Sequence, residues 1–250
     1  DLQRFLMESA VLDRFDAELC RSVLGDAHAA RRLDEVRAAG LFLVPLGSGG
    51  RWYRYHHLFG ELLTHRLATA DPERHDALLH AASAAAEARG EIEPALEYAA
   101  RMRGDARLLA LLDAHGLALL GRSAVAGLRR WLAGVDLTHV RPYPLAWCAD
   151  AWLRVVTERV GDPAPLVARI EAALDQAGPD YEASRREQAR MHTHILSAYA
   201  ARYRHRWAEA LAAGEAAHAI SPRPEPMSRG FLIYNTARVR MALGQMRAAD

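Results

Sequence analysis

The spacing of apolar residues changes twice between residues 41 and 67. Residues 41–46 are apolar, residues 47–50 are three glycines and a serine, and residues 52–55 bring back aromatic side chains. Glycines supply the positive φ angles of a tight reversal and aromatic residues favour strands, so this stretch predicts a β-hairpin. The spacing then becomes helical, which predicts a helix with one apolar face. Its apolar positions are Leu58, Leu62, Leu63 and Leu67.

Three short helices are predicted before the hairpin. The first covers residues 2–9, the second is capped by Asp16 and ends at Gly25, and the third ends at Gly40. A lone hairpin cannot bury its apolar face in water, so it must pack on these helices. Helices followed by a two-stranded wing predict a winged-helix domain over residues 1–70.

Residues 71–140 are predicted to form a linker region of paired helices. Asp71 and Pro72 supply a helix cap and a first-turn proline. Glycines predict breaks between helices of about 10–14 residues. These glycines are Gly90, Gly104, Gly116 and Gly134.

A helical repeat becomes visible in residues 141–250. The second helix of a tetratricopeptide unit is matched at Trp207, Ala210, Ala217 and Pro222. Residues 185–203 would form the first helix of that unit. A weaker copy spans residues 147–174, and a later copy begins at Arg229, with a second helix near Ala249 that is truncated at the C-terminal end. The predicted fold class is therefore mainly α, with an N-terminal winged helix and β-hairpin followed by an α-helical tetratricopeptide-like superhelix.

Composition narrows the class of protein. The 250 residues include 32 basic and 31 acidic side chains, so the net charge is close to zero. The chain therefore has no overall positive charge that would attract nucleic acid or an anionic membrane. No apolar run is long enough to span a bilayer, and no leader peptide is recognisable. The two cysteines, Cys20 and Cys148, predict buried thiols in a reducing compartment rather than a disulfide or a zinc site. We expect a cytoplasmic protein.

The sequence carries no recognisable catalytic centre. A GxxxxGK[ST] loop does not occur, so the chain cannot hold ATP by a P-loop. Its 12 histidines lack the spacing of a helical zinc site, and its serines lack a nucleophile elbow. We expect no enzyme, no metal and no cofactor within these residues. The basic and aromatic run 202–207 could contact nucleic acid or form a solvated turn between helices, and we favour the turn.

Several strings resemble one protein family: FLMESAVLDRFDAELCRSVLG, LFLVPL, RWYRYHHLFGELLTHRL and LRRWLAGV. They are similar to the region downstream of the ATPase core in large ATP-binding LuxR-type transcriptional activators, the family of the maltose-regulon activator. The resemblance implies an ATPase domain with bound ATP or ADP before the winged helix. It also implies a DNA-binding helix-turn-helix after the repeats, with both of these domains outside this chain.

The resemblance and the repeat register also give candidate site residues. Related signalling ATPases place a winged-helix histidine against the nucleotide β-phosphate. His56 matches that position, His57 is a weaker candidate, and a merely packed histidine is the alternative. The positions that would line a repeat groove are His192, Tyr199, Arg202, Phe231, Tyr234 and Arg238. These six would bind an inducer or a partner, or else serve as packing and surface residues.

These inferences predict the regulatory and sensing portion of a transcriptional activator. Its partners would be an inducer small molecule or a regulatory protein at the repeats, the ATPase domain of the same protein, and other copies through self-association. DNA would be contacted only through the C-terminal domain, and no membrane contact is expected. Inducer binding would favour an open form that permits nucleotide exchange. The alternative is a tetratricopeptide scaffold that docks a protein without sensing a small molecule.

Overall fold

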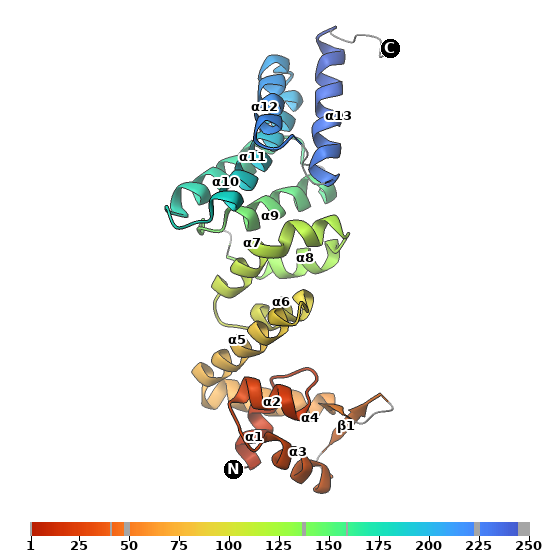
Figure 1. The fold of residues 1–250 in the computed structure, drawn as a ribbon, viewed down its shortest axis with the longest axis vertical. Coiled ribbons are helices and arrows are strands. Elements are labelled where there is room, and N and C mark those ends of the chain that lie inside the picture. The colour runs from red at the N-terminus through yellow and green to blue at the C-terminus, as the bar shows by residue number, and fades with distance from the viewer. Residues whose placement is uncertain are drawn as a thin grey trace. The chain divides into compact units, whose positions relative to one another are not determined.

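The computed structural model describes residues 2–40, 42–47, 51–136, 139–158, 160–222 and 226–244 (Figure 1). These residues are mainly helical and contain one two-stranded sheet, which confirms the predicted class. They divide into two compact units, residues 1–107 and residues 108–250. The predicted domain boundaries near residues 70 and 140 fall inside these two units and stay predictions.

The first unit begins with the predicted winged helix. Its elements are α1 (Leu2–Ser9), α2 (Ala17–Leu24), α3 (Ala29–Ala38), β1 (Leu43–Leu46), β2 (Trp52–Tyr55) and α4 (His57–Ala70). The two strands pair antiparallel, with Leu43 opposite Tyr55 and Leu46 opposite Trp52. The hairpin predicted from the apolar and aromatic runs is therefore confirmed.

Local chemistry sets the ends of α2 and joins the wing to the helices. Asp16 accepts a hydrogen bond from the backbone N–H of Leu19 at 2.8 Å, and Gly25 ends α2 with a φ of 74°. Phe15, just before this cap, exchanges two backbone hydrogen bonds of 2.8 Å with Tyr53 of β2. The wing is therefore attached to the helical part by main-chain hydrogen bonds as well as by packing.

Helix α4 differs from the prediction in the face that it buries. Leu63 and Leu67 are buried, whereas Leu58 and Leu62 are 63% and 50% exposed. Residues four apart share a row along a helix, and these two rows are about 100° apart around the axis. Only one row reaches the core, so the prediction that all four leucines form one apolar face is wrong.

Two further helices complete the first unit, α5 (Pro72–Ala88) and α6 (Ile92–Ala100). Asp71 caps α5 by accepting from the backbone N–H of Arg74 at 3.0 Å, and Pro72 occupies the first turn, as predicted. The Arg74 guanidinium also donates to Glu8 at 2.8 Å and to the carbonyl of Leu24 at 3.0 Å. This one side chain therefore ties α5 to both α1 and α2.

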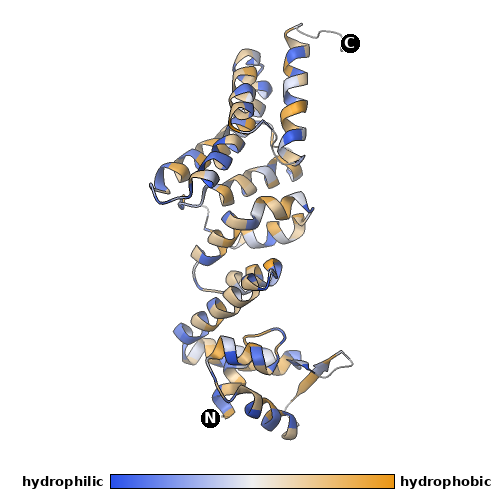
Figure 2. Cartoon of the chain, in the orientation of Figure 1, coloured by the Kyte–Doolittle hydropathy of each residue, from blue (hydrophilic) through white to orange (hydrophobic). Residues whose placement is uncertain are grey.

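The remaining helices belong to the second unit, apart from the first two residues of α7. They are α7 (Ala106–Gly121), α8 (Val125–Ala133), α9 (Pro144–Thr157), α10 (Ala164–Gln176), α11 (Ala183–Tyr203), α12 (Trp207–Ile220) and α13 (Pro226–Ala242). Figure 2 shows hydrophobic and hydrophilic residues interleaved along these helices. This interleaving is typical of helices that bury one side.

Gly116 does not end a helix, so the break predicted there is wrong. It is a buried residue inside α7, where a Cβ atom would lie 3.0 Å from the Cβ of Ala149 in α9. The absence of a side chain lets the two helices approach, and this packing offsets the roughly 1 kcal/mol that glycine costs in a helix. Helices α5 and α7 have 17 and 16 residues and exceed the predicted length for the same region.

The later helices pack in the order that the repeat pattern predicts. Helix α9 packs against α10, α11 against α12, and α12 against α13 (Figure 1). Helices α11 and α12 coincide with the predicted pair, and the small residues Ala210 and Ala217 are buried. The helix predicted near Ala249 lies outside the described residues. Assignment of these pairs to the tetratricopeptide class stays a prediction.

Candidate functional site

The corner between β2 and α4 presents two histidines to solvent. His56 occupies the N-cap position of α4, and its backbone N–H donates to the carbonyl of Phe42 at 2.7 Å. His56 and His57 are both exposed, with ring centroids 6.0 Å apart. Neither imidazole forms a hydrogen bond or an ion pair within the part of the chain that the structure describes. Both rings can therefore meet a group from outside this unit.

Tyr55 fixes the backbone direction at this corner. Its hydroxyl is hydrogen-bonded to the Ser9 hydroxyl at 2.8 Å. Its ring centroid lies 5.0 Å from that of Phe15 and 5.7 Å from that of Phe59. Burial raises the pKa of Tyr55, so the hydroxyl stays protonated and keeps its hydrogen bond. The chain therefore enters α4 at His56 from a position held by packing on three sides.

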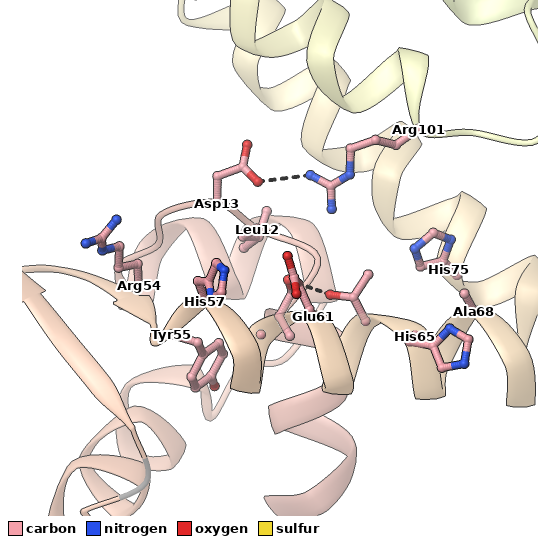
Figure 3. Close-up of a pocket in the computed structure, with 13 residues that line it drawn as sticks. Leu12, Asp13, Arg54, Tyr55, His57, Glu61, His65, Ala68, His75 and Arg101 are labelled. Carbon is pink, nitrogen blue, oxygen red and sulfur yellow. Dashed lines mark hydrogen bonds and ion pairs between the residues drawn. The ribbon is translucent and has the colours of Figure 1, made fainter. Parts of the chain in front are cut away.

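A cavity of about 650 Å³ adjoins this corner, and we call it the wing cavity (Figure 3). It is bounded by the loop after α1, the end of β2, one face of α4, the start of α5 and the segment after α6. Its charged and histidine side chains are Asp13, Arg54, His57, Glu61, His65, His75 and Arg101. Cations, anions and imidazoles thus share one concave surface within the first unit.

Some of this lining is used by the fold. Arg101 donates to Asp13 at 3.0 Å and to the carbonyl of Val11 at 2.9 Å, and its guanidinium lies over the Tyr98 ring. Burial, and then the charge of Arg101, lowers the pKa of His75, so this imidazole is neutral at neutral pH. The Nε2 atom of His75 is buried and has no hydrogen-bond partner among the described residues.

Four other polar side chains in the lining make no polar contact with the rest of the described residues. The side chains of Arg54, His57, Glu61 and His65 form no hydrogen bond or ion pair within the described ranges. Those at positions 57, 61 and 65 share one face of α4, because residues four apart lie in one row. This polar row was visible in the sequence as a regular spacing, but the neighbouring leucines dominated the interpretation of α4. Arg101 and the cavity itself gave no signal in the sequence.

The structure places two of the predicted groove residues among packing residues of the second unit. His192 is fully buried, and the indole N–H of Trp152 donates to its Nδ1 atom at 3.0 Å. The ring of Phe231 lies 4.4 Å from the ring of Trp152. Together these contacts join α9, α11 and α13.

Three other predicted groove residues come together at α11 and α13. The guanidinium carbon of Arg202 is 4.8 Å from the ring centroid of Tyr199 and 5.7 Å from that of Tyr234. Its Nε atom donates to the side-chain oxygen of the buried Asn235 at 2.8 Å. Arg238, the sixth predicted residue, is exposed. A cation held beside two aromatic rings can bind a polar ligand or a peptide.

The described residues lack a cluster of metal-ligating side chains, and both of their cysteines are buried. No group of three or more His, Cys, Asp or Glu side chains among them could hold a metal ion. Burial raises the pKa of Cys20 to about 12 and also raises that of Cys148, so neither free thiol is a ready nucleophile. No helix in the ranges given above is long and apolar enough to cross a bilayer.

Comparison with known proteins shows which family the start of the first unit resembles. Residues 1–75 match the family model of the MalT winged helix domain. Over 184 residues the chain is 28% identical to the HTH-type transcriptional regulator MalT of Vibrio cholerae serotype O1. This alignment covers 74% of this chain and 20% of the Vibrio protein. The chain is MalT-like.

Other MalT proteins show the same extent of similarity. The chain is 31% identical over 179 residues to MalT of Cronobacter sakazakii, covering 70% of this chain and 19% of that protein. It is 30% identical over 177 residues to MalT of Klebsiella pneumoniae subsp. pneumoniae, an alignment that covers 69% of this chain and 19% of that protein. The chain thus spans about a fifth of the length of the curated relatives it matches. Similarity to MalT regulators supports a regulatory role, and the family match lies on the winged helix, not on an ATPase core.

Proposed function

We propose that this chain is the regulatory and sensing portion of a LuxR-type ATP-dependent transcriptional regulator. In this proposal the winged helix gates a nucleotide-binding domain of the same cytoplasmic protein, and the helical pairs bind an inducer or a partner. DNA is bound by a separate C-terminal domain. Inducer binding shifts the population toward a form in which the winged helix releases the nucleotide domain.

The observation that carries this proposal is an uncovered apolar surface beside His56. Phe42, Leu58 and Leu62 are 62%, 63% and 50% exposed. The ring of Phe42 lies 5.2 Å from that of Phe59, so the wing and α4 contribute to one surface. Large exposed apolar side chains that gather in one place are typical of a docking surface. A neighbouring domain seated there would come up against the His56 imidazole.

His56 is suited to the nucleotide-sensing role that the MalT-like character suggests. Its exposed imidazole can donate a hydrogen bond to a phosphate oxygen, and its backbone position is fixed by the bond to Phe42. ATP or ADP would supply the phosphate, and most of its other contacts would come from the domain that holds it. The winged helix would therefore report whether the nucleotide site is closed.

The test is the variant His56→Ala in the full-length regulator. Loss of one hydrogen bond to a charged oxygen should speed ADP release about tenfold and raise activity without inducer. His65→Ala removes an exposed histidine from within α4, away from the His56 corner, and is the matched control, which should leave ADP release unchanged. Equal ADP retention in wild type and His56→Ala would contradict the proposed role.

The scaffold alternative is favoured by the packing of His192, which is fully buried against Trp152 and not free to contact a ligand. Phe231 is half-buried, and its ring also packs on Trp152. Under the sensing proposal, most of the ligand contacts then fall to Tyr199, Arg202, Tyr234 and Arg238. A thermal-shift screen with sugars and metabolites separates the two functions, because a ligand that binds only the folded state raises the melting temperature. A scaffold should respond only to a protein partner.

A further inference from the structure

We propose that the wing cavity binds a zwitterionic ligand of the size of an amino acid or a short peptide, with its carboxylate at Arg54 and its ammonium group at Glu61. This site is separate from the nucleotide contact proposed for His56 and from the predicted groove of the second unit. It requires no group from outside the first unit.

This inference rests on the charged side chains of the cavity that have no ion-pair partner among the described residues. Arg101 and Asp13 neutralise each other at 3.0 Å, and Arg101 is further held by the carbonyl of Val11. Among the described residues, the fixed charges of the lining that remain without a partner are Arg54 and Glu61. One is a cation at the end of β2 and the other is an anion one turn into α4 (Figure 3). The unpaired charges therefore sum to zero and are of opposite sign.

This charge pattern selects the ligand class. A polyanion would be attracted by Arg54 but repelled by the Glu61 carboxylate. A polycation would be attracted by Glu61 but repelled by Arg54. A zwitterion satisfies both groups at once. A sugar or a nucleobase usually stacks on an open aromatic face, and the aromatic ring in this lining, Tyr55, is buried.

The rest of the lining suits the middle of such a ligand. His65 is exposed, and its imidazole nitrogens have no hydrogen-bond partner among the described residues, so they can bond to peptide N–H and C=O groups. Leu12 and Ala68 supply apolar surface between the polar groups. A volume of about 650 Å³ lies in the range of ordinary small-molecule sites and leaves room for more than one residue.

The test is calorimetric titration of the full 250-residue chain at pH 7, where the terminal ammonium group of a peptide is mostly charged and an ordinary imidazole is mostly uncharged. The probes are alanine, dialanine and trialanine, each with both termini free. We expect at least one of them to bind with a dissociation constant of about 1 mM or tighter. N-acetyl-trialanine and trialanine amide each lack one terminal charge and should bind about tenfold more weakly than trialanine.

Variants then locate the binding. Arg54→Gln and Glu61→Gln should each weaken peptide binding about tenfold. Arg66→Gln, an exposed arginine of α4 outside the cavity, should leave it unchanged. The inference is overturned if no free peptide binds, if a blocked peptide binds as tightly as the free one, or if either cavity variant matches Arg66→Gln. None of these results bears on ADP release in His56→Ala, so the two proposals fail separately.

Discussion

Replacing Asp113 by alanine is expected to destabilise the second unit by about 3 kcal/mol. Asp113 lies in α7 and is 4% exposed. Its carboxylate caps α9 from a distance in sequence, accepting from the backbone N–H groups of Leu145 at 2.7 Å and Ala146 at 3.2 Å. It also accepts from the Tyr181 hydroxyl at 3.1 Å and from Arg185 at 2.5 Å.

The magnitude follows from the partners that alanine would leave behind. Two backbone N–H groups at a buried helix start would lose their acceptor, at about 1 kcal/mol or more each. Arg185 is partly exposed and can turn to water, so its loss adds less. Asp113→Asn keeps one oxygen for the N–H groups and should cost only about 1 kcal/mol.

The pH dependence provides an independent check on this reasoning. Burial raises the pKa of Asp113, although Arg185 and the hydrogen bonds act in the opposite direction. The folded state therefore holds a proton more tightly than the unfolded state, whose value is 3.8. The stability from this group is fully present below that value and is lost as pH rises through the folded pKa. Asp113→Asn should remove that part of the pH profile.

Urea unfolding followed by tryptophan fluorescence measures these effects, because Trp131, Trp147 and Trp152 of this unit are all buried. Asp175→Ala, an exposed aspartate of α10, serves as the matched control and should change stability by less than about 0.5 kcal/mol. If Asp113→Ala lowers the unfolding free energy no more than Asp175→Ala does, the remote cap contributes nothing and the reasoning fails.

Two further variants test the first unit and the helix crossing at Gly116. Burial alone would raise the pKa of Glu8, but hydrogen bonds from Arg74 and Arg4 lower it below 4.5. The stability from Glu8 is thus present above 4.5 and lost as pH falls through the folded value. Arg74→Ala should cost about 2 kcal/mol at pH 7 and flatten this acid loss, and an unchanged urea profile at pH 4 and 7 would contradict it. Gly116→Ala should lower the melting temperature because the new Cβ would crowd the Cβ of Ala149. Gly60→Ala should raise it, because the new Cβ would lie 3.5 Å from the Cβ of Tyr55 and alanine favours the helix. The opposite ranking of the two melting temperatures would refute the packing argument.

Features that depend on neighbouring residues could be predicted from the sequence. The hairpin follows from strand-forming residues on both sides of a glycine-rich turn, and Asp16 and Asp71 cap helices because their side chains reach the next backbone N–H groups. Which face of α4 is buried could not be predicted, because both leucine rows are equally apolar. The core of the domain selects one row, and Leu58 and Leu62 remain outside.

The candidate sites divide in the same way. His56 could be proposed as a candidate from the sequence because a short string carries the family resemblance, and its role stays a prediction. The wing cavity could not, since Asp13, Arg54 and Arg101 lie far apart in the sequence and meet only when α1, β2 and α6 pack. Likewise, the repeat register brought His192 and Phe231 into one set, but it carried no sign that both pack against Trp152.

The paired main chains of Phe15 and Tyr53 determine how the wing can move. Two backbone hydrogen bonds of 2.8 Å join the middle of β2 to the connection between α1 and α2, so tilting the hairpin alone would break both of them. Tyr53 is thereby linked to Phe15, the residue just before Asp16 and the start of α2. We therefore expect β2 and the start of α2 to move together when the wing is displaced.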